Sequence, residues 1–242
     1  MRIVAALLLM LVFQSAFAGA DYEREKKWAD EVIPGIVVGD PVYLELSSGH
    51  KFLGIFTEVK DARMGLVVVH GIGIHPDWNM VGTLRTQLAE FGYTTLSIQM
   101  PVLANDAKSK AYDALFPQAA DRIDVAVKFL RAKGYKKIAI VSHSMGSAMS
   151  RQYVKSNQSK LAAWASLGIG HGYSYEGIRI PVLDMYGEYD LQPVLRMAAK
   201  RAVTLKGNAK SMQVKLLKSD HFYNNHEAEM VQEVKRFLDS IE

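Results

Sequence analysis

The sequence predicts an α/β protein whose sheet is mostly parallel and is covered by helices on both faces. Short β-branched runs such as 65–69 and 138–141 alternate along the chain with stretches of helical periodicity. These runs are apolar throughout, as expected for strands that are buried on both faces of a parallel sheet. Polar and glycine-rich residues follow several of the runs, where open α/β sheets bind ligands. A chain of 242 residues fits one such domain.

The N-terminus has the pattern of an export signal. Arg2 precedes an apolar run over 3–13, and residues 14–18 have the small-x-small form that precedes signal cleavage. The run is too short to span a bilayer comfortably, so we expect cleavage after Ala18, or after Ala20 as second choice, and no integral membrane segment after processing. The chain has no cysteine, which excludes lipoprotein anchoring and disulfides. We expect an exported protein, periplasmic or alternatively secreted.

The expected organisation is a signal peptide over 1–18, an N-terminal segment over 19–40 and the α/β domain over 41–242. The N-terminal segment has a short helix over 23–32. Four short apolar or alternating runs predict the strands of the first half: 42–46, 52–56, 65–69 and 94–98. The first two form a hairpin at an antiparallel edge of the sheet. One helix between the last two strands has its apolar side chains on one face, at Val81, Leu84, Leu88 and Phe91.

The second half repeats the alternation. Its strands are expected at 138–141, 162–167, 182–186 and 212–217. Its helices show apolar residues at three- and four-residue spacing, over Ile123–Leu130, Pro193–Leu205 and Met230–Ile241. The segment between the strand 94–98 and the next helix, 102–118, is too short for a large lid domain. Its apolar residues Tyr112, Leu115 and Phe116 are more often core than pocket lining.

Ser144 lies at the turn between the strand 138–141 and a following helix. Its neighbours Ser142 and Gly146 are small, so strand and helix can pass closely, as a strained nucleophile turn requires. Ser142 departs from the G-x-S-x-G pattern at its first position. The amide of Met145 lies at the helix N-terminus, where unpaired N–H groups favour developing negative charge. The alternative is a serine that only caps the helix.

A serine nucleophile needs a base and an acid that orients the base. Of the seven histidines, His221 directly follows the final strand and is our candidate base. Asp190 follows the strand 182–186 and is the candidate acid, with Glu188 and Asp220 in reserve. The other histidines have commoner explanations. Exposed positions in turns, loops or a helix start are expected for His50, His75, His171 and His226. His70 is expected to shape the loop after its strand, and His143 to point away from its neighbour Ser144. Asp184 lies inside a strand without an evident partner.

The turn after the strand 65–69 is the candidate second half of an oxyanion hole. Ile72 is our choice for the amide that complements the Met145 amide, and Gly71 and Gly73 let the backbone approach closely. Taken alone, a Gly-x-Gly turn after a strand is also compatible with an ordinary loop.

From about Pro41 to the C-terminus the chain resembles the α/β-hydrolase superfamily. The resemblance rests on four motifs in order: His70-Gly71, Ser142-His143-Ser144-Met145-Gly146, Gly187-Glu188-Tyr189-Asp190 and Asp220-His221-Phe222. It implies the α/β-hydrolase fold with an eight-stranded type of sheet, Ser144 as nucleophile, Asp190 as acid and His221 as base. The segments 75–78 and 94–101 resemble a group of exported bacterial α/β-hydrolase-like proteins whose substrate is not established.

The leading functional hypothesis is a serine hydrolase that cleaves an ester, thioester or related acyl bond of a small or lipid-like substrate. No metal or organic cofactor is implied. A serine at the turn, rather than a carboxylate or a cysteine, argues against dehalogenase, epoxide-hydrolase and dienelactone-hydrolase chemistry. The net charge of +4 comes from scattered lysines and arginines, which argues against a nucleic-acid partner. The alternative is a non-catalytic exported protein that binds a partner or lipid in the cleft.

Overall fold

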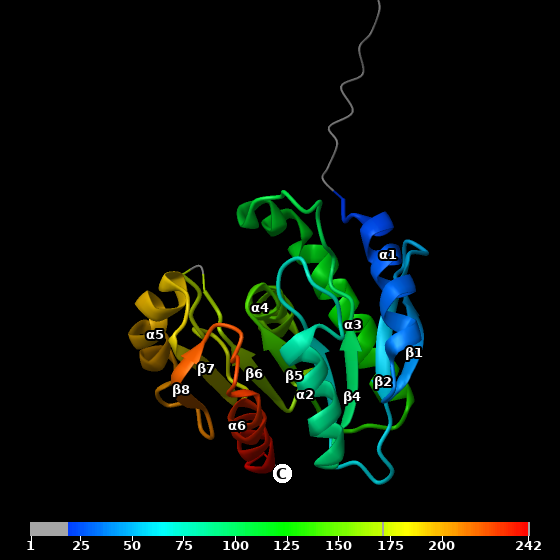
Figure 1. Ribbon diagram of the computed structural model, residues 1–242. Helices are drawn as coiled ribbons and strands as arrows, with labels where there is room; N and C mark the ends of the chain where they lie inside the picture. Colours follow the sequence, from blue (N-terminus) through cyan, green and yellow to red (C-terminus); the bar gives the residue numbers. More distant parts are fainter. Residues whose placement is uncertain (1–18, 171, 242) are drawn as a thin grey trace, which may run out of the picture.

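The computed structural model describes residues 19–170 and 172–241, which form an eight-stranded sheet with helices on both faces (Figure 1). The strand order is β1-β2-β4-β3-β5-β6-β7-β8. Strand β2 runs antiparallel to β1 and β4, and all other neighbours are parallel, which confirms the predicted hairpin at the sheet edge. The strands are β1 (Asp40–Glu45), β2 (Lys51–Thr57), β3 (Gly65–Val69), β4 (Thr94–Ile98), β5 (Ile138–His143), β6 (Ala163–Leu167), β7 (Val182–Tyr189) and β8 (Met212–Asp220). The predicted signal peptide, 1–18, lies outside the described residues.

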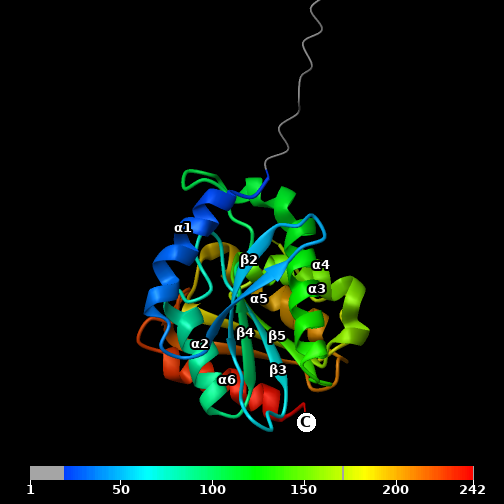
Figure 2. The same cartoon turned by 90° about the vertical axis from the view of Figure 1, so that its right-hand side faces the viewer.

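The helices cover the sheet in two layers. Helices α2 and α6 pack on one face, and α3 and α4 pack on the other (Figure 2). Helix α5 packs against β7 and β8 at the far edge from β1. The helices are α1 (Tyr22–Val32), α2 (Asn79–Glu90), α3 (Phe116–Ala132), α4 (Met145–Asn157), α5 (Gln192–Leu205) and α6 (Glu227–Asp239), with short 3-10 helices η1 (Ile33–Gly35), η2 (Ser109–Leu115) and η3 (Gln158–Lys160).

Alternate residues of the central strands supply the two cores. In β3, Leu66 and Val68 face the layer of α2 and α6, whereas Val67 and Val69 face the layer of α3 and α4. All four side chains are buried. A strand covered on both faces gains from apolar residues at every position, which explains the uninterrupted apolar runs of the sequence.

Three of the parallel strands extend further at their carboxyl ends than the sequence predicts. Strand β5 ends at His143, β7 at Tyr189 and β8 at Asp220, because polar residues continue the backbone pairing at the carboxyl edge of the sheet. The pairing of β7 with β8 shifts register between Gly187 and Tyr189. A Cβ at residue 187 would lie 2.4 Å from the carbonyl oxygen of Ser219, so this close approach requires glycine. Apolar periodicity does not reveal such polar strand ends.

The segment between β4 and α3 is compact, and within the described residues no separate lid domain covers the sheet edge. Tyr112 and Leu115 of η2 are buried in the core, and the Tyr112 hydroxyl accepts a hydrogen bond from the Leu103 amide. Phe116 packs against the same core. These three side chains therefore belong to the hydrophobic core, which is the role that the sequence favours for them.

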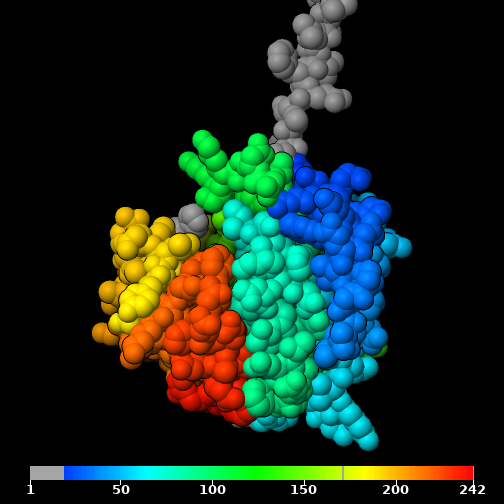
Figure 3. Space-filling model, in the orientation of Figure 1, coloured from blue at the N-terminus to red at the C-terminus, as the bar shows by residue number. Residues whose placement is uncertain are grey.

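Helix α1 packs directly against the sheet domain. Figure 3 shows it beside the segment that follows β4. The buried carboxylate of Glu25 accepts two hydrogen bonds from the guanidinium of Arg122 in α3, at 2.9 and 3.0 Å. Arg24 donates to the carbonyls of Leu103 and Gly73, at 2.5 and 3.2 Å. Neither α1 nor any other helix of the described residues has the length and apolar content that crossing a bilayer requires.

Candidate active site

Three side chains from separate loops meet at the carboxyl edge of the sheet. His221 Nε2 lies 2.9 Å from Ser144 Oγ, and His221 Nδ1 lies 2.6 Å from Asp190 Oδ1. The Asp190 carboxylate is buried and also accepts from the amides of Leu191 and Gly187, at 2.7 and 3.2 Å. A carboxylate at Nδ1 favours the tautomer whose proton lies on that nitrogen, which leaves Nε2 free to accept the hydroxyl proton.

The turn at Ser144 has the strained geometry that its position suggests. Its backbone has φ 55° and ψ −123°, a conformation that non-glycine residues rarely adopt. A Cβ at residue 146 would lie 2.2 Å from the carbonyl oxygen of His70, so only glycine lets the helix pass. A Cβ at residue 71 would lie 3.2 Å from the Ser144 Cβ. The loop after β3 therefore approaches the serine closely at Gly71, where the sequence predicts a close approach of the backbone.

The serine at position 142 is accommodated in the core behind this turn. The Trp164 indole donates to Ser142 Oγ at 2.8 Å, and Ser142 Oγ donates to the Ala165 carbonyl at 3.3 Å. Both side chains are buried. The departure from the glycine pattern thus gives a buried indole N–H its acceptor.

A cavity of about 250 Å³ opens beside Ser144 and His221. Its other lining residues are mostly apolar or glycine: Ile72, Ser109, Met145, Gly168, Gly170, Leu191, Pro193 and Val194. Ile72 and Met145, whose amides are the candidate oxyanion donors, both belong to this lining. A hollow of about 400 Å³ lies at the opposite edge of the sheet, between residues 59–63 and 133–137, and no candidate site residue lines it.

The reserve acids have other partners. Glu188 Oε2 accepts from the Lys218 amide at 2.9 Å. Asp220 Oδ1 accepts from the amides of Phe222 and Asn224, at 2.9 and 3.1 Å, and so shapes the turn that presents His221. Burial would raise the pKa of Asp220, but the hydrogen bonds from Asn224 and from the turn amides outweigh it and lower the pKa. Asp190 is therefore the carboxylate that pairs with His221.

Two buried histidines support the loops of the site. His143 Nε2 donates to the His221 carbonyl at 2.8 Å, so it holds the main chain of the candidate base. His70 Nδ1 donates to the Gly71 carbonyl at 2.8 Å, and His70 Nε2 accepts from the Met100 amide at 2.9 Å. Burial lowers the pKa of each ring to about 3, so both are neutral at pH 7. The sequence predicts that His70 shapes its loop, whereas the contact of His143 with the His221 carbonyl is visible only in the structure.

Among the described histidines, His221 alone lines the cavity beside Ser144. His50, His75 and His226 are half-buried, and the expectation that they are simply exposed was wrong. His50, for example, stacks on Tyr22 with the ring centroids 3.5 Å apart. His171 lies outside the described residues. Within residues 19–170 and 172–241 no three His, Asp or Glu side chains are grouped as a metal site would require.

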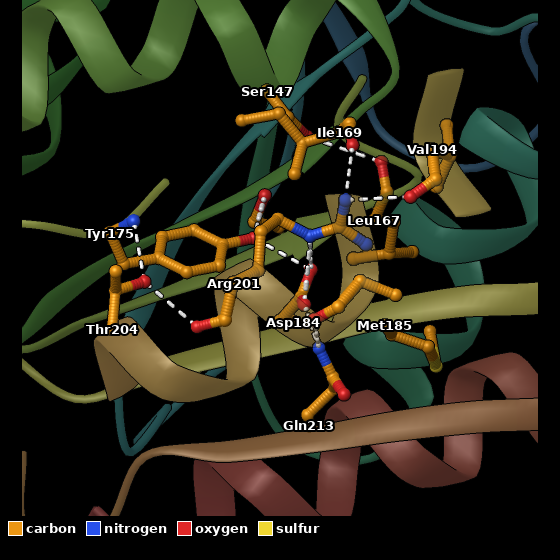
Figure 4. Close-up of polar contacts among 12 residues, drawn as sticks. Ser147, Leu167, Ile169, Tyr175, Asp184, Met185, Val194, Arg201, Thr204 and Gln213 are labelled. Carbon is orange, nitrogen blue, oxygen red and sulfur yellow. Dashed lines mark hydrogen bonds and ion pairs between the residues drawn. The ribbon is translucent and has the colours of Figure 1, made fainter. Parts of the chain in front are cut away.

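Asp184, whose partner the residue pattern leaves open, forms a buried ion pair with Arg201 of α5 (Figure 4). The sequence did contain a signal for it. Arg201 falls on the buried face of the helix at the spacing of Val194, Ala198 and Leu205. An arginine on an apolar face needs a buried acid, and an aspartate inside the adjacent strand supplies one.

The comparisons with known proteins concern the fold. No family model and no curated protein matches the chain. Among solved structures, Est1E from Butyrivibrio proteoclasticus has a TM-score of 0.67 at 14% identity, covering 83% of this chain and 98% of its own. A dienelactone hydrolase from Anabaena variabilis has a TM-score of 0.69 at 16% identity, covering 83% and 96%.

A third similar structure is a Xanthomonas campestris protein described as an α/β serine hydrolase without lid. Its TM-score is 0.65 at 13% identity, and the match covers 85% of this chain and 95% of that one. Identities this low indicate shared architecture and leave substrate and activity open to separate argument. The order of the eight strands, the helices on both faces and these matches together show that the protein has the α/β-hydrolase fold.

Proposed function

We propose that the protein is a serine hydrolase that cleaves an ester, thioester or related acyl bond through Ser144, His221 and Asp190. The observation that carries the proposal is the continuous hydrogen-bonded chain from Ser144 Oγ through His221 to the buried Asp190 carboxylate. This series of hydrogen bonds ends at Ser144, which has a strained backbone and lines a cavity. A serine that only capped α4 would need neither the imidazole nor the strain, and Ser144 makes no side-chain cap to that helix.

The mechanism follows from the positions of these atoms. Ser144 Oγ attacks the carbonyl carbon, and its proton passes to His221 Nε2. The buried Asp190 carboxylate stabilises the imidazolium that forms. The amides of Ile72 and Met145 are the proposed hydrogen-bond donors to the carbonyl oxygen as it becomes negative. His221 then protonates the leaving alcohol or thiol. Water next attacks the acyl group on Ser144 while His221 accepts the water proton, and His221 returns a proton to Ser144 Oγ as the acyl group leaves.

The cavity lining indicates the kind of acyl group. Among the described residues that line it, His221 is the one ionisable side chain, so an uncharged group is favoured because a charge would lose its hydration without a partner. Similar folds include an esterase of Pyrococcus furiosus, and Est1E has been solved with ferulic acid bound. These neighbours support ester chemistry over other uses of the fold.

Labelling with a fluorophosphonate tests the nucleophile. The wild-type protein should become labelled, and Ser144→Ala should not. Ser109→Ala is the matched control, because this serine lines the same cavity but has no part in the proposed chain, and it should label like the wild type. Folded wild-type protein that resists labelling would favour the non-catalytic alternative, in which the cleft binds a partner or lipid.

The base assignment has its own test. We expect His221→Ala to lower turnover of a short-chain nitrophenyl ester by at least ~100-fold, which is within the usual range for a general base. Equal rates for variant and wild type would refute the assignment.

We further propose that the enzyme acts after export, with the segment 1–18 removed, as the apolar run and the small residues before Ala18 suggest. Intact-mass measurement of the protein purified from its source tests this. A chain that begins at Gly19 or Asp21 would support it, and a retained Met1 would refute it.

A further inference from the structure

The Asp184–Arg201 pair has more hydrogen-bond partners than charge neutralisation requires. Arg201 Nε lies 2.9 Å from both carboxylate oxygens of Asp184, and both side chains are fully buried. The carboxylate also accepts from the Tyr175 hydroxyl at 2.8 Å and from the side-chain amide of Gln213 at 2.7 Å. Desolvating two charges is costly, and a well-packed apolar pair often gives equal or greater stability. Stability alone therefore does not account for the pair.

The other side of the guanidinium reaches two segments that border the cavity. Arg201 Nη1 donates to the Ile169 carbonyl at 3.1 Å and to the Val194 carbonyl at 2.9 Å (Figure 4). Ile169 lies between Gly168 and Gly170, which both line the cavity, and Val194 lines it from the first turn of α5. One nitrogen thus ties together two walls that belong to separate parts of the chain.

The loop that Arg201 holds at Ile169 also contacts the candidate base, His221. Gly168 packs against the imidazole so closely that a Cβ there would lie 3.0 Å from His221 Cε1. Its amide donates to the Met185 carbonyl of β7, at 2.8 Å. The loop of residues 168–170 is therefore held from the sheet on one side and from Arg201 on the other.

We propose that Arg201, with its charge balanced by Asp184, is a positioning residue that fixes the separation of these two walls and so limits the size of the acyl group that Ser144 accepts. The inference rests on the proposed function. A guanidinium suits the task because its planar fork serves a carboxylate and backbone carbonyls at once, which the single ammonium of lysine cannot do with the same geometry.

Two variants test the proposal. Arg201→Lys keeps the charge opposite Asp184 but loses the fork. The double variant Asp184→Asn/Arg201→Met removes both charges, so no isolated charge is left buried. The matched control is Arg85→Met, because Arg85 is also buried and donates to Asp77 and to the Val38 carbonyl, at 2.6 and 2.5 Å, but contacts no wall of the cavity.

The first readout is the ratio of kcat/KM for nitrophenyl octanoate to that for nitrophenyl acetate. In both Arg201 variants we expect this ratio to rise at least threefold, because looser cavity walls admit a longer acyl group. In Arg85→Met the ratio should change by less than threefold. A smaller change, or a shift toward acetate, would overturn the proposal. A merely structural role would lower stability in all three variants without changing the preference.

The second readout does not need activity. Amide hydrogen exchange in peptides covering 163–170 and 191–198 should be at least tenfold faster in the Arg201 variants than in the wild type or Arg85→Met. Unchanged exchange would overturn the proposal. If the wild type hydrolyses neither ester, the proposed function fails, and exchange still shows whether Arg201 holds the two walls.

Discussion

Replacing Gly168 by alanine should impair catalysis more than it impairs folding. The residue has φ +60°, and an added Cβ would lie 3.0 Å from His221 Cε1, 3.1 Å from His221 Nδ1 and 3.7 Å from Asp190 Oδ2. The first two distances are shorter than ordinary van der Waals contacts. The imidazole has little room to retreat, because Ser144 and Asp190 hold its two nitrogens.

The magnitude follows from two separate effects. An alanine in the left-handed region costs roughly 1–2 kcal/mol. In a domain of this size that corresponds to a fall in Tm of about 2–8 °C. The contact with the ring forces a displacement of some tenths of an ångström. Since ~1 Å of misplacement can cost ~100-fold, we expect a shift of this size to lower kcat by roughly 3–10-fold.

Gly177→Ala separates these effects. Gly177 has φ +78°, and a Cβ there would meet nothing within 4 Å. Its substitution carries the same backbone strain without the contact, so Tm should fall similarly and kcat should not change. The assays are thermal unfolding by circular dichroism and steady-state hydrolysis of nitrophenyl acetate. If Gly168→Ala kept kcat within twofold of the wild type, the reasoning about its contact with His221 would be refuted.

Three further predictions concern stability, measured by urea unfolding. Glu25→Ala should lower the free energy of unfolding by about 3–5 kcal/mol, because it leaves the Arg122 charge buried without its ion-pair partner. Replacing the exposed Glu23 of the same helix by alanine should lower it far less, and equal losses would contradict the prediction. Ser142→Gly should cost about 1–3 kcal/mol because the Trp164 indole loses its acceptor; an unchanged or higher stability would count against that role. Burial lowers the pKa of His70 and His143 from 6.5 to about 3, so between these pH values the unfolded chain binds protons that the folded chain does not. The free energy of unfolding should therefore fall as the pH drops, by roughly 1.4 kcal/mol per pH unit for each ring, and His143→Gln should remove one share of this slope.

The residue pattern alone determined the class of fold and the loops that hold the candidate site. Strands buried on both faces must be apolar throughout, so 65–69 and 138–141 stand out without a structure. Parallel strands bring their carboxyl ends to one edge, which places Ser144, Asp190 and His221 in the same region before any coordinates exist. The small residues around Ser144 indicated the sharp turn, because local sterics require them.

Tertiary structure alone decided which acid faces His221, since Asp190, Glu188 and Asp220 all lie at that edge and only their hydrogen bonds separate them. It also decided that the aspartate of β7 meets Arg201, and that the ring of His143 reaches the His221 carbonyl. Periodicity reports whether a side chain is buried, not which group it faces. Partners distant in sequence are chosen by the packing of whole elements, and a hydrogen bond depends on distances of a few tenths of an ångström that only the packed chain defines.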